Sequence, residues 1–62
     1  MNNSCEIGKT FDTILYEYKV NSYNGPWPVN KKIVLLIKNL LLNYGLTVYT
    51  ERKDNTDFIR IF

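Results

Sequence analysis

One stretch decides the fold that this sequence predicts: residues 29–45 read VNKKIVLLIKNLLLNYG. Its apolar residues recur at the three- and four-residue spacing of a helix that buries one face. Pro28 or Asn30 can begin this helix, and Gly45 stands where a left-handed backbone would end it. We therefore predict a helix over Val29 to Tyr44, with a core face centred on Ile33, Ile37, Leu40 and Tyr44.

Two leucines of this helix fall outside the predicted core face. Leu35 and Leu42 lie one heptad apart on the opposite side, near Lys31 and Lys38. A pair of large apolar side chains on the outer side of a helix favours contact with another molecule.

The residues that follow the helix predict a β-hairpin. Leu46 to Arg52 and Asp57 to Phe62 are rich in β-branched and aromatic residues, and the polar segment 53–56 separates them. Asp54 and Asp57 are interpreted as turn-forming residues, because this segment lacks the glycine and the distal glutamate of a calcium loop.

The residues before the helix predict one more strand. From Asp12 to Val20 the sequence alternates, with Ile14, Tyr16, Tyr18 and Val20 on one side, which is typical of a half-buried strand. Segment 21–28 is dense in turn-forming residues and predicts a loop. Residues 1–10 predict a flexible arm, with a short added N-terminal strand as the alternative.

These elements predict one α+β domain over residues 1–62. A single helix packs on a small three-stranded sheet in the order strand-helix-strand-strand, a split β-α-β arrangement with the last strand in the centre. The helix covers only one face of such a sheet. We expect the other face to carry Leu15, Glu17, Lys19, Tyr49, Glu51, Phe58, Arg60 and Phe62.

The composition argues against several classes of function. The chain has 62 residues, one cysteine, no histidine and a formal net charge of +2. A lone cysteine forms no internal disulfide and no zinc site, and no histidine is present to activate Cys5. We therefore expect no enzymatic activity, no metal and no cofactor. A domain of this size buries only about 60% of its unfolded surface, so we expect stabilisation through a homodimer.

The expected setting is the cytoplasm, without a membrane or a small-molecule substrate. The sequence shows no secretory signal pattern, and its longest apolar run, residues 33–37, is far below the roughly 20 residues of a membrane span. Alanine and glutamine are absent while Asn, Lys, Ile and Tyr are abundant. Such a composition is associated with AT-rich genomes, including those of viruses, phages and other mobile elements.

The surplus of apolar surface predicts a protein-interaction module, in its concrete form a regulator or inhibitor of another macromolecule. Its expected contacts are an aromatic residue on a proline-stiffened loop, the outer helix leucines and the aromatic sheet face: Trp27, Leu35, Leu42, Tyr49, Phe58 and Phe62. Trp27 has an alternative interpretation as a lid over the core.

Two other functions stay open. A nucleic-acid-binding protein would stack bases on the sheet aromatics and contact phosphates through Lys19, Lys31, Lys32, Arg52, Lys53 and Arg60. Glu17, Glu51 and the small net charge weigh against this hypothesis. The other function is a structural subunit of a larger assembly, which the same apolar surfaces would support.

Overall fold

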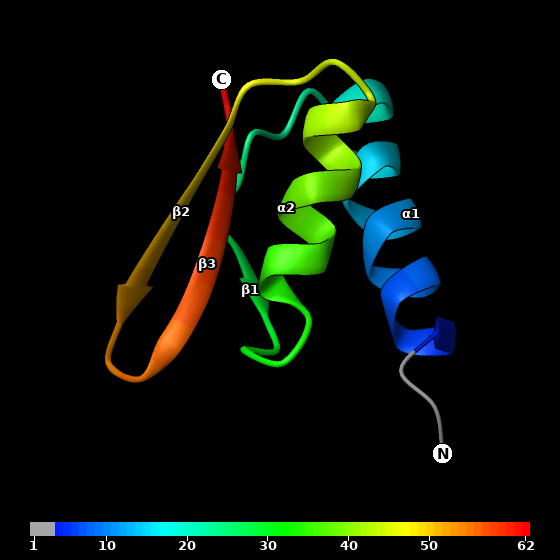
Figure 1. Cartoon of the computed structure of the whole chain (residues 1–62). Coiled ribbons are helices and arrows are strands. Elements are labelled where there is room, and N and C mark those ends of the chain that lie inside the picture. The colour runs from blue at the N-terminus through cyan, green and yellow to red at the C-terminus, as the bar shows by residue number, and fades with distance from the viewer. Residues whose placement is uncertain (1–3) are drawn as a thin grey trace.

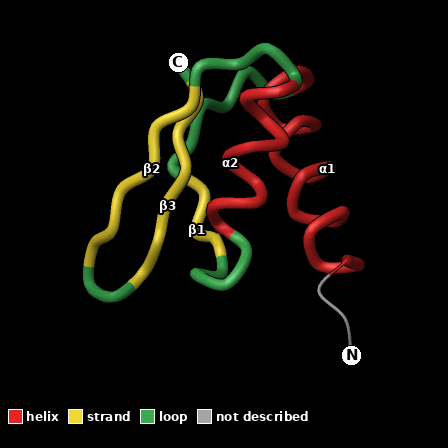
Figure 2. The backbone as a smooth tube through the Cα atoms, viewed as in Figure 1, coloured by secondary structure: helices red, strands yellow, loops and turns green. Residues whose placement is uncertain are grey.

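The computed structural model describes residues 4–62 and contains two helices and three strands. In chain order these are helix α1 (Ser4–Val20), strand β1 (Trp27–Val29), helix α2 (Val34–Asn43), strand β2 (Val48–Lys53) and strand β3 (Thr56–Ile61). The sheet has the order β1-β3-β2, and both strand pairs are antiparallel. The two helices lie side by side on one face of this sheet (Figures 1 and 2). Neither helix within residues 4–62 is long and apolar enough to cross a bilayer.

The α+β class, the three-stranded sheet and the central position of the last strand are confirmed. The order strand-helix-strand-strand also holds, but the first strand is Trp27–Val29 rather than Asp12–Val20. Trp27 and Pro28 of this strand lie in the segment predicted as a loop from its turn-forming residues, and Val29 lies at the predicted start of the helix. It is an edge strand, where a residue without an N–H is tolerated.

The predicted strand over Asp12–Val20 is wrong, and with it the prediction of a single helix. These residues form the second part of α1, and residues 4–10 of the predicted arm form the first part. The side chains of α1 that contact the core recur with helical spacing: Ile7, Phe11, Ile14, Leu15 and Tyr18. Residues 1–3 of the predicted arm, and any strand formed there, lie outside the described residues.

The hairpin is confirmed, but its turn is two residues long rather than the predicted segment 53–56, and Asp57 lies in β3 rather than in the turn. Strands β2 and β3 are joined by Asp54 and Asn55, whose φ angles are 53° and 64°. Two consecutive left-handed residues are typical of the type I′ turn that closes a two-residue hairpin. The turn sets a register in which Lys53 lies opposite Thr56 and Glu51 opposite Phe58.

Helix α2 ends as predicted but begins later. Gly45 has a φ of 100°. Its N–H donates to the carbonyl of Leu42 at 3.0 Å, and the N–H of Leu46 donates to that of Leu41 at 3.2 Å, which is a Schellman ending. The helix begins at Val34, because Val29 belongs to β1 and a turn at residues 31–33 separates the two elements.

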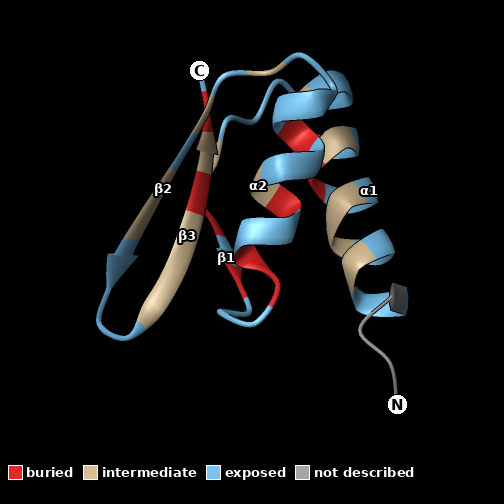
Figure 3. Cartoon of the chain, viewed as in Figure 1, coloured by how far each residue is buried: buried red, intermediate tan, exposed pale blue. Residues whose placement is uncertain are grey.

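The core lies between the sheet and the two helices (Figure 3). It consists of Ile14, Trp27, Val29, Ile33, Val34, Ile37, Leu41, Ile59 and Ile61. Two residues predicted at the centre of the core face of α2, Leu40 and Tyr44, are exposed instead. The buried arc of α2 is displaced toward Val34 and Leu41, because this helix packs against both strands of the hairpin.

Candidate interaction surfaces

The face of the sheet turned away from the helices is the first candidate surface. Successive side chains of a strand point to opposite faces, and Ile59 and Ile61 of β3 are buried beneath the helices. The intervening residues of β3 and their cross-strand neighbours therefore form the other face. We call this surface the open sheet face: Pro28, Tyr49, Glu51, Phe58, Arg60 and Phe62.

The placement predicted for Tyr49, Glu51, Phe58, Arg60 and Phe62 on this face is confirmed by the register. The placement of Leu15, Glu17 and Lys19 there is wrong, because these residues belong to α1. Pro28 joins the face from β1, opposite Phe58; the predicted loop over residues 21–28 does not place it there.

The open sheet face combines an aromatic pair with a pair of opposite charges. The rings of Tyr49 and Phe62 meet edge-on with centroids 6.1 Å apart, and their side chains are 50% and 70% exposed. The Nε of Arg60 lies 3.6 Å from an oxygen of Glu51. The face is therefore apolar in large part and carries little net charge.

The outer side of α2 is the second candidate surface. Four leucines of this helix are exposed: Leu35, Leu36, Leu40 and Leu42. The prediction that Leu35 and Leu42 lie outside the core is confirmed, and Leu35 is 66% exposed. Sequence reasoning missed the exposure of Leu36 and Leu40, because the helical pattern places Leu40 at the centre of the predicted core face and Leu36 at its flank.

The four leucines form two separate rows, since successive helical residues are rotated by about 100°. Tyr44 marks the side of α2 that faces α1, because its ring meets that of Phe11 at a centroid distance of 6.3 Å. Leu36 and Leu40 lie near this side. Leu35 and Leu42 lie on the opposite side, away from α1.

Trp27 is a core residue, as in its interpretation as a lid. Its side chain is only 6% exposed, and its Nε1 donates a hydrogen bond to Oε1 of Glu17 at 2.9 Å. Tyr23 covers it with an edge-on ring at a centroid distance of 5.2 Å. A partner would reach only the rim of this indole, so the structure gives little support to its predicted role as an anchor.

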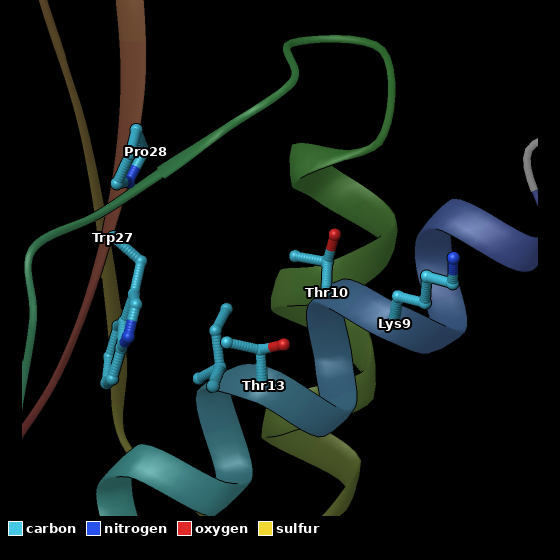
Figure 4. A pocket seen from close by; sticks show the side chains of 6 residues that line it. Lys9, Thr10, Thr13, Trp27 and Pro28 are labelled. Carbon is cyan, nitrogen blue, oxygen red and sulfur yellow. The ribbon is translucent and has the colours of Figure 1, made fainter.

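Two open hollows flank Trp27. One, of about 210 Å³, is lined by Lys9, Thr10 and Thr13 of α1 together with Ile14, Trp27 and Pro28 (Figure 4). The other, of about 500 Å³, lies between Glu17 and Pro26. Small-molecule sites bury most of their ligand, and these hollows are wide and open to solvent. Their lining does not favour a small-molecule site.

The cations proposed for nucleic-acid contact do not form one basic surface. Arg60 is paired with Glu51, and the Nε of Arg52 lies 3.7 Å from an oxygen of Asp57. Lys19 hydrogen-bonds the hydroxyl of Tyr44 and lies 4.5 Å from the centre of its ring. The remaining predicted cations are exposed at two separate places: Lys31 and Lys32 in the turn before α2, and Lys53 at the end of β2 beside the hairpin turn.

Within the described part of the chain, no cluster of three or more His, Cys, Asp or Glu side chains is placed to hold a metal ion. Cys5 is a free, exposed thiol in the first turn of α1. Comparison with known protein families, curated proteins and solved structures finds no match to this chain. The candidate surfaces therefore have to be judged on their own chemistry.

Proposed function

We propose that this chain is a non-enzymatic protein-binding module that acts as a homodimer and regulates or inhibits the protein it binds. The open sheet face carries this proposal, because Tyr49, Phe58 and Phe62 stand on a rigid strand pair with no helix of residues 4–62 above them. Aromatic side chains held on rigid elements suit protein recognition. A contiguous group of exposed apolar side chains on so small a domain favours contact with another molecule.

The charges support a protein partner over a nucleic acid. A surface that binds phosphates needs cations free of neighbouring carboxylates. Arg60 on the open sheet face is paired with Glu51, and Arg52 at the neighbouring edge is paired with Asp57, so the cation turned to this side beyond them is Lys53 beside the hairpin turn. Because these arginines are paired with carboxylates, the aromatic residues of the face are left to make the contacts. Such residues favour binding to apolar and aromatic side chains of a protein.

The test compares three baits in affinity capture from the cells that produce the protein: the wild type, Tyr49→Thr with Phe62→Thr, and Tyr16→Thr with Val20→Thr. Threonine keeps the preference for strands at the first pair of sites. The control pair lies on α1, where both side chains are 60% exposed. We expect a protein that the wild type and the control retain and the sheet-face variant loses.

Circular dichroism checks that all three baits are folded. The proposal fails if no captured protein depends on Tyr49 and Phe62. It also fails if the wild type binds single-stranded or duplex oligonucleotides with an affinity that falls steeply with salt, since phosphate contacts produce that dependence.

A further inference from the structure

We propose that the second copy in the homodimer docks along the outer edge of β2, with the two β2 strands paired antiparallel about Thr50. This inference deepens the proposed function, because it rests on the homodimer and names the surface that forms it. The two sheets would join into one, with the helices of both copies on the same side and the two open sheet faces continuous on the other.

The hairpin register shows which backbone groups of β2 are free. A two-residue turn makes Lys53 and Thr56 a hydrogen-bonded pair, and such pairs recur at every second residue of an antiparallel ladder. The N–H of Phe62 donates to the carbonyl of Thr47 at 2.9 Å, which continues the same series. The N–H and C=O groups of the alternate residues, Val48, Thr50 and Arg52, therefore point away from β3.

Pairing about Thr50 uses every one of these outward groups. Thr50 then lies opposite Thr50 of the second copy and exchanges two hydrogen bonds with it. Val48 lies opposite Arg52 of the second copy. By the two-fold symmetry, Arg52 lies opposite Val48 of the second copy. The cross-strand threonine pair is itself a favourable combination in antiparallel sheets.

The charges of β2 select the same register. Pairing about Thr50 places Glu51 opposite Tyr49 of the second copy. A shift by one residue to pair about Glu51 would set two carboxylates directly against each other, which is destabilising. A shift to pair about Tyr49 would leave the outward groups of Arg52 without partners.

The outer leucines of α2 lie beside the same edge. The hydrogen bond from Trp27 to Glu17 places α1 beside β1, and α2 packs on β2 and β3. The side of α2 that faces away from α1 is therefore turned toward the free edge of β2. Leu35 and Leu42 lie on that side, and the two-fold axis brings them against the same leucines of the second copy.

The opposite edge of the sheet does not offer this contact. In β1 the outward position is held by Pro28, which has no N–H to donate. Beyond β1 the edge of β3 is already occupied, because the N–H of Ile61 donates to the carbonyl of Asn24 at 3.0 Å and the side-chain amide of Asn24 donates to the carbonyl of Ile61 at 2.9 Å. Strand β2 contains no proline.

Two measurements test this inference: disulfide trapping and the molecular mass of the protein in solution. In a Cys5→Ser background, Thr50→Cys should form a disulfide-linked dimer, because Cα atoms in a hydrogen-bonded antiparallel pair are about 5.5 Å apart, within the range of about 4.4–6.8 Å for disulfides. The matched control Lys53→Cys should stay unlinked, since Lys53 lies far from Lys53 of the second copy in this register. Sedimentation of the unmodified protein should report a dimer.

Substitutions at the β2 edge and on the neighbouring side of α2 provide a second test. Thr50→Pro removes an outward N–H without touching the β2–β3 ladder, and we expect it to raise the dimer dissociation constant by at least about 100-fold. Leu35→Glu with Leu42→Glu should also give a folded monomer, which keeps the test decisive should Thr50→Pro not fold.

A dimer that persists in the leucine variant and shows no Thr50→Cys linkage would overturn this edge while leaving the homodimer intact. A protein that stays monomeric up to millimolar concentration would overturn both the edge and the homodimer. Neither result depends on the capture experiment, which tests the open sheet face.

Discussion

The indole N–H of Trp27 and the carboxylate of Glu17 form a hydrogen bond of 2.9 Å that ties strand β1 to helix α1. Both groups are partly buried, and Trp27 is the chain's only tryptophan. Since β1 is a short strand at the edge of the sheet, this bond contributes to holding α1 against the core.

Removing the acceptor should destabilise the fold. We expect Glu17→Ala to lower the free energy of unfolding by about 1–3 kcal/mol, because a buried donor is left without a partner. The matched control, Asp12→Ala, removes an exposed carboxylate from the same helix and should have a much smaller effect. Urea unfolding followed by the fluorescence of Trp27 measures both, and equal losses in the two variants would contradict the role of Glu17.

Two glycines should respond to alanine in opposite directions. Gly25 has a φ of 99°, and an added Cβ would lie 2.6 Å from the carbonyl oxygen of Ile59, so Gly25→Ala should cost at least about 2 kcal/mol of stability. Gly8 lies inside α1 with no atom within 4 Å of an added Cβ, so Gly8→Ala should stabilise by about 0.5–1 kcal/mol. Thermal unfolding of both variants checks the signs, and a tolerated Gly25→Ala would refute the close approach to β3.

The hairpin turn offers a site for stabilisation. Asn55 has a φ of 64°, which glycine adopts without the steric cost that a side chain imposes. We expect Asn55→Gly to raise the free energy of unfolding by about 0.5 kcal/mol and Asn55→Val to lower it by about 1 kcal/mol. Denaturant midpoints of the two variants should shift in opposite directions. A stabilising valine would show that the turn is not type I′.

The parts of the fold that could be predicted depend on local chemistry. Gly45 ends α2 because a left-handed residue is needed there, and the polar residues Asp54 and Asn55 suit the turn between two apolar strands. Each signal acts over only a few residues, so the hairpin and the end of α2 can be recognised without the rest of the molecule. The open sheet face follows, because its side chains are set by the alternation of those strands.

The first third of the chain could not be predicted because two periods coexist there. Ile14 and Tyr18 belong both to the alternation of residues 14–20 and to the helical row that starts at Ile7 and Phe11. The β-branched and aromatic residues favoured a strand, whereas packing against α2 favours a helix, and tertiary contacts override such local preferences. Continuing the row back to Ile7 would have shown the helix.

Strand β1 was missed because proline normally argues against a strand. The argument fails at an edge, where the N–H of Pro28 would have had no neighbour in the sheet. The predicted role of Trp27 as an exposed anchor rests on the same loop prediction. A residue in a loop can face solvent, whereas a residue opposite Ile59 in this register faces the helices, as in the interpretation of Trp27 as a lid.

Pro28 also limits how far the sheet can extend by adding strands. A sheet with donors on both edges can add molecule after molecule and grow into a fibril. Within residues 4–62, Pro28 leaves β1 without an outward N–H, so in the proposed dimer each copy would cover the β2 edge at which the other could be extended. In the proposed dimer the pairing would end at two copies, and Pro28 would hinder the strand addition at the remaining edges that leads to amyloid-like aggregation.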